Sequence, residues 1–177
     1  MSDWIAPPVD RTDDGSYSGE ERALLEGFLD YHRQTLLWKC AGLTADQLAR
    51  RWVESSNLSL QGLIRHLTDV ERGWFRRGVD QQSPAEAPPV YFTDERPDDD
   101  FDQVDPARAE AEYAAYLAEL ELVRAAAGRH ELTDSYSSTH RGPITLRWVY
   151  LHMLEEYARH NGHADLLRER ADGATGE

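Results

Sequence analysis

The stretch Ile144–Arg170, ITLRWVYLHMLEEYARHNGHADLLRER, has the pattern of one long amphipathic helix. Its apolar side chains recur every three or four positions and so share one face. This apolar stripe consists of Leu146, Val149, Tyr150, Met153, Tyr157, Ala164 and Leu167. His160 lies within the stripe. Glu156 lies one turn earlier on its flank, with His152 and His163 beside it. Because burying a charge is costly unless it is paired or bound to a metal, we expect the Glu156–His160 pair to hold an ion.

Three other segments have the same helical period, at residues 19–40, 60–77 and 106–127. Ser59 precedes the second segment as a predicted N-cap, and Asp105 followed by Pro106 opens the third. Four long amphipathic helices predict an all-α fold, a four-helix bundle. In such bundles, metal sites are built in the core from side chains on facing helices.

We expect one domain, because 177 residues can bury a proper core. The bundle is predicted at residues 19–170, with an N-terminal arm at 1–18 and a frayed C-terminal tail at 171–177. A long, proline-rich crossover loop at 79–105 contains the acidic run 98–100, which we interpret as solvated surface. The sequence leaves open whether this loop closes over the site as a lid.

The charge of the chain excludes several classes of partner. A formal net charge of −14 repels phosphate backbones and anionic membranes, so neither nucleic acid nor a membrane is an expected partner. No apolar run reaches the length of a membrane span, and no basic-then-apolar signal pattern is present, which predicts a cytoplasmic protein.

The aromatic content permits either a monomer or a homodimer.

Cys40 is the only cysteine, so the chain has neither an internal disulfide nor a cysteine-rich zinc site. It lies at the end of the apolar helix 19–40, and we interpret it as a small core residue rather than a nucleophile. His32 lies in the apolar stripe of the same helix. We interpret it first as a core-edge histidine with a hydrogen-bond partner, and second as a residue that lines a pocket.

The third candidate ligand is His66, at the edge of the apolar stripe of helix 60–77. Gly62 and Gly73 share its sector, and glycine weakens a helix, so we expect them to make room for a ligand or another helix. Together with Glu156 and His160, His66 completes a set of two imidazoles and one carboxylate. Such a set leaves a position open on zinc, as catalytic sites do. By spacing alone, buried histidines without a metal remain an alternative.

Three segments resemble the DinB superfamily, and within it a DinB-like group of actinobacteria: TLLWKCAGLTADQL, SLQGLIRHLTDVERGWF and ITLRWVYLHMLEEYARHNGHADLLRE. The resemblance covers residues 19–170 and implies an up-down-down-up bundle with a divalent metal on three side chains. Many members carry H-x3-H and then a GQ-like pair in the last helix, where this chain has Glu156-x3-His160 and then Gly162-His163. In this respect it is similar to mycothiol-dependent maleylpyruvate isomerases. The resemblance implies His66, Glu156 and His160 as the metal ligands, with Zn²⁺ expected and Ni²⁺ or another divalent ion as alternatives.

The resemblance also implies a metal-dependent thiol S-transferase. The metal would activate mycothiol, or a similar low-molecular-weight thiol, for attack on an electrophilic small molecule. Near the mouth of the site, Arg65, Arg72, Arg159 or His163 are candidates to hold the thiol co-substrate; we single out His163 and Arg159.

Two other functions are compatible with the same residues. A metal-dependent hydrolase or isomerase would activate water at the open position and need no thiol. A non-catalytic, stress-induced metal-binding bundle would be stabilised by the metal and consume no electrophile.

Overall fold

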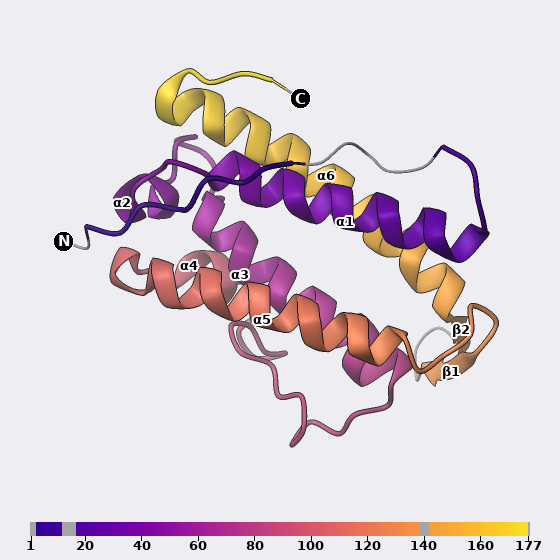
Figure 1. Ribbon diagram of the computed structural model, residues 1–177. Coiled ribbons are helices and arrows are strands. Elements are labelled where there is room, and N and C mark those ends of the chain that lie inside the picture. Colours follow the sequence, from indigo (N-terminus) through magenta and orange to yellow (C-terminus); the bar gives the residue numbers. More distant parts are fainter. Residues whose placement is uncertain (1–2, 12–16, 139–141, 177) are drawn as a thin grey trace.

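The computed structural model describes residues 3–11, 17–138 and 142–176, and its four long helices form a bundle. These helices are α1 (Glu21–Cys40), α3 (Leu60–Glu71), α5 (Ala109–Ala127) and α6 (Leu146–Asp172). Figure 1 shows α1 and α6 running in one direction and α3 and α5 in the other, which is the up-down-down-up order. Helix α1 packs mainly on α6, and α3 packs mainly on α5. The predicted all-α four-helix bundle is therefore confirmed.

Shorter elements connect the long helices. They are α2 (Ala45–Ala49), α4 (Asp99–Asp102), the 3-10 helix η2 (Pro106–Arg108), and the antiparallel strands β1 (Ser135–Ser138) and β2 (Gly142–Thr145). Two predicted caps are confirmed: the Ser59 hydroxyl accepts from the Gly62 amide at 3.0 Å, and the Asp105 carboxylate accepts from the Ala107 amide at 2.9 Å.

The structure corrects several predicted helix boundaries. The helix predicted at 19–40 begins at Glu21. The predicted helix 60–77 is α-helical only to Glu71 and continues as a π-helix, η1 (Arg72–Val79). The last helix begins at Leu146 rather than Ile144, because residues 142–145 pair with β1. Thr145 then caps α6 by accepting from the Trp148 amide at 3.2 Å.

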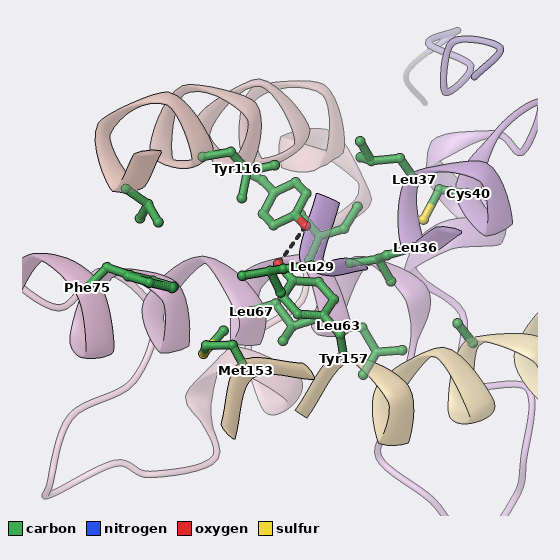
Figure 2. Packing of buried hydrophobic residues seen from close by; sticks show 14 of the residues in the cluster. Leu29, Leu36, Leu37, Cys40, Leu63, Leu67, Phe75, Tyr116, Met153 and Tyr157 are labelled. Carbon is green, nitrogen blue, oxygen red and sulfur yellow. Dashed lines mark hydrogen bonds between the residues drawn. The ribbon is translucent and has the colours of Figure 1, made fainter. Parts of the chain in front are cut away.

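The core contains a buried polar network that reaches all four long helices. Arg33 of α1 donates through two nitrogens to the two carboxylate oxygens of Glu71 of α3, each at 2.7 Å. The Tyr157 hydroxyl of α6 also donates to Glu71, at 2.8 Å. Figure 2 shows Tyr157 meeting Tyr116 of α5 among buried leucines, with the two hydroxyl oxygens 2.7 Å apart. This network fixes how α6 sits against its three neighbours.

Described residues near both ends of the chain contact the bundle. In the arm, the Ala6 amide donates to the Leu43 carbonyl at 2.9 Å, while residues 1–2 and 12–16 lie outside the described part. At the other end, α6 continues to Asp172, and Lys39 donates to the Gly176 carbonyl at 2.5 Å. The domain boundaries themselves stay a prediction. None of the described helices combines the length and apolar composition that a membrane-spanning helix requires.

Candidate metal centre

Helix α3 presents His66 toward α6, and the crossover loop encloses it. The rings of Phe101 and Phe92 stack on His66, with centroid distances of 5.2 Å and 6.1 Å. Gly62, one turn earlier, gives Phe101 its place: a Cβ on Gly62 would lie 2.8 Å from the Phe101 ring. The expected room around this glycine is therefore filled by the loop.

Helix α6 supplies the other two candidate ligands, which are one turn apart because their spacing is i, i+4. His160 is buried, and its Nε2 lies 3.4 Å from Oε2 of Glu156, which is partly buried. The His160 and His66 rings approach with centroids 4.8 Å apart. Two facing helices thus place two imidazoles and one carboxylate together.

One donor atom from each of His66, Glu156 and His160 can be chosen so that all three lie within 4.8 Å of one another. Two ligand atoms at about 2.0–2.2 Å from one tetrahedral zinc lie about 3.4 Å apart, so small side-chain movements suffice to bind it. The donor set fits a divalent cation chemically as well, since imidazole and carboxylate are common zinc ligands. The arrangement leaves at least one coordination position for a further group.

The imidazole of His160 is kept neutral. Burial is the main cause, and the neighbouring His66, His163 and Arg159 add electrostatic repulsion, so that the pKa of His160 falls from 6.5 to about 3. A neutral imidazole keeps the lone pair that a metal ligand needs.

The structure separates the candidate thiol-binding residues. His163 lies beside the site, with its Nδ1 3.4 Å from Nδ1 of His160. Arg159 is exposed and pairs with Glu155 at 2.5 Å, so it does not reach the ligands. Arg65 and Arg72 are engaged elsewhere, paired at 2.5 Å with Glu112 and Glu119 respectively.

His152 lies between two tryptophans rather than among the ligands. Its ring stacks on Trp148 at 4.9 Å and meets the edge of Trp74 at 4.6 Å. Its Nε2 is 3.6 Å from Oε1 of Glu156, so it borders the site from the opposite side to His160.

Two interpretations of the α1 residues are confirmed. The Asn161 amide group lies 3.3 Å from Nδ1 of His32, which gives His32 a polar partner at the core edge. Cys40 has no exposed surface, and burial raises the pKa of its thiol to about 12.

The acidic run 98–100 is not simply solvated surface, and this interpretation was wrong. Asp100 is only 1% exposed, and its Oδ2 lies 2.7 Å from Nδ1 of His66. Phe92 and Phe101 belong to the same loop. Because 34 positions separate Asp100 from His66, no helical or strand period could have linked the two residues.

Comparison with known proteins agrees with this architecture. The family model described as mycothiol-S-transferase matches residues 24–173, a span that contains all three candidate ligands and the crossover loop. Searches among curated proteins and among solved structures gave no match.

Proposed function

Because the chain belongs to the mycothiol-S-transferase family, we propose that it is a transferase that joins the sulfur of mycothiol to an electrophilic small molecule at a divalent metal. His66, Glu156 and His160 would hold the metal. Zn²⁺ is the expected ion, because two imidazoles and one carboxylate with an open position are the donor set of catalytic zinc.

The convergence of the three donors is the observation that carries this proposal. His66 on α3 lies 90 positions before Glu156 on α6, yet one donor atom from each of the three residues lies within 4.8 Å of the others. One of them, His160, is held neutral by burial.

The thiol must come from a co-substrate. Cys40 is the only cysteine, and it is fully buried with a pKa raised to about 12, so the chain has no reactive thiolate of its own. A divalent cation, when bound, lowers the pKa of a thiol at its open position and so favours the nucleophilic form.

The side chains around the ligands have distinct roles in this proposal. Glu156 brings the one negative charge to the cation, and the two histidines bring neutral nitrogens. His163, partly exposed beside His160, is our candidate to contact mycothiol. The rings of Phe92 and Phe101 exclude water from one side of His66.

Elemental analysis tests the metal ligands directly. We expect near-stoichiometric zinc or another divalent metal in the purified wild type, and its loss in His160→Ala. His152→Ala is the matched control on the same helix face and should retain the metal. A wild type that stays metal-free after metal is added back would contradict the proposal. Loss of metal only in His152→Ala would show that the ligand register is wrong.

The two other functions predict different reactions. A hydrolase or isomerase without a thiol would consume its substrate in the absence of mycothiol, and a non-catalytic bundle would consume no electrophile at all.

We also propose that the enzyme is cytoplasmic, because low-molecular-weight thiols are kept reduced in the cytoplasm.

A further inference from the structure

The buried carboxylate of Asp100 contacts His66 from the crossover loop. Its Oδ2 lies 2.7 Å from Nδ1 of His66, and its Oδ1 accepts from the Phe101 amide at 2.9 Å. The side chain of Asp100 is 1% exposed, whereas that of His66 is 21% exposed. Both oxygens of this buried charge are thus hydrogen-bonded within the protein, as a buried carboxylate requires.

This contact decides which nitrogen of His66 carries the proton. An ionised carboxylate only accepts hydrogen bonds, so Nδ1 of His66 must be the protonated nitrogen of a neutral ring. The lone pair then lies on Nε2, on the far side of the ring from Asp100. In metal sites, a carboxylate in this position orients the ring and makes the ligand more basic.

We propose that Asp100 is a positioning residue that selects the Nδ1–H tautomer of His66 and so presents Nε2 as a metal ligand. The metal-binding part of this inference rests on the proposed function. The tautomer does not, because it is a property of the metal-free protein.

Asp100 is not needed merely to attach the loop. Arg65 already holds this segment, donating to the Asp100 carbonyl at 2.7 Å and to the Asp99 carbonyl at 2.9 Å. Farther back in the loop, the buried carboxylate of Asp69 accepts from the amides of Val90 and Tyr91 at 2.9 Å and 2.7 Å. With these attachments in place, the carboxylate of Asp100 is available to act on His66.

The substitution Asp100→Asn separates a role in attaching the loop from a role in orienting His66. It keeps the size and shape of the side chain but changes its hydrogen bonding. An asparagine has one oxygen acceptor. We expect this oxygen to stay on the Phe101 N–H, which also donates to the Asp98 carbonyl at 3.0 Å, because the NH2 group in its place would face another donor. The side-chain amide nitrogen would then face Nδ1 of His66 and donate to it. The proton of the ring would move to Nε2 and occupy the nitrogen that is required for the metal.

The first experiment is ¹⁵N NMR of the histidine rings in metal-free protein at alkaline pH, with His66 assigned by substitution. We expect the proton of His66 on Nδ1 in the wild type and on Nε2 in Asp100→Asn. A wild-type His66 protonated on Nε2 would overturn the inference, and this measurement requires no Asp100 variant to fold.

The second experiment is zinc affinity by chelator competition. Asp100→Asn should bind zinc about 10- to 100-fold more weakly, the usual cost of losing such a carboxylate partner. Asp98→Asn is the control: it makes the same charge change in the same run, at an exposed residue whose side chain makes no capping bond. Equal weakening in both variants, or none in Asp100→Asn, would overturn the positioning role. If neither the wild type nor the variants bind zinc, the proposed function fails. The NMR measurement still tests the His66 tautomer, because it is made on metal-free protein.

Discussion

The buried imidazole of His160 gives the metal-free protein a specific dependence on pH. In the unfolded chain this ring takes up a proton near its ordinary pKa of 6.5, but in the folded chain it does so only at about 3, mainly because of burial. The folded state is therefore penalised as the pH falls from 6.5 toward 3, by at most about 1.4 kcal/mol per pH unit.

We expect His160→Gln to lose less stability than the wild type between pH 7 and pH 4, since glutamine does not titrate. Urea unfolding with a chelator present, at several pH values, measures the difference between the two proteins. Parallel stability curves would show that His160 does not stay neutral in the folded state.

Single residues differ in how far the sequence could predict them. Glu156 and His160 could be predicted together, because a helical period places i and i+4 on one face. His66 could be proposed as their partner from its position at the edge of an apolar stripe, but no helical period links it to them because it lies on another helix, and the family resemblance supported that choice. Asp100 could not be predicted, because its role depends on a loop whose path no local pattern determines.

Among the elements, the crossover loop is attached to the bundle through buried polar contacts. The buried carboxylate of Asp69 accepts from the backbone amides of three successive residues, Val90, Tyr91 and Phe92, at 2.9 Å, 2.7 Å and 3.3 Å. This part of the loop is thereby fastened to α3 one turn after His66, with Phe92 stacked on the His66 ring.

We expect Asp69→Ala to release this segment, because three amides lose their acceptor. Hydrogen exchange of the amides at 90–92 should become at least about tenfold faster, the factor that corresponds to about 1.4 kcal/mol. Asp94→Ala, an exposed position in the same loop, should leave their exchange unchanged. Unchanged protection in Asp69→Ala would mean that other contacts hold the loop.

Helices were more predictable than their ends and connections. Apolar periodicity is a sum over many residues, so the four long helices follow from it. The strand β2 was missed because its residues lead directly into α6, and the predicted helix began within them. The π-helix η1 likewise continues the apolar pattern of α3 and gives no separate signal.

At the scale of the whole molecule, the Arg33–Glu71 ion pair holds the bundle together from inside. Neither side chain is more than 5% exposed, and the pair connects through Tyr157 to Tyr116, so that one network includes residues of all four long helices. The helical periodicity of apolar residues cannot predict such a network, because it carries no information about contacts between polar side chains.

We expect Arg33→Met to destabilise the fold by about 3–5 kcal/mol, because it leaves the charge of Glu71 buried and unpaired. That is a large share of the stability of an ordinary domain. Arg147→Met, which breaks the surface pair with Glu21, should change stability little. Denaturant unfolding compares the two. Equal effects would show that the interior pair does not hold the bundle together.

The consumption of mycothiol in the presence of electrophiles is the most direct test of metal-dependent sulfur transfer. The assay would compare four proteins: zinc-loaded wild type, chelator-stripped wild type, Glu156→Gln and the exposed control Glu155→Gln. Each would be given mycothiol with epoxides, activated haloarenes or unsaturated carbonyls. We predict that at least one electrophile is conjugated to mycothiol by the zinc-loaded wild type and by Glu155→Gln, and that activity is lost on stripping and in Glu156→Gln. Equal conjugation by the stripped protein and by Glu156→Gln would contradict a role for the metal held by His66, Glu156 and His160.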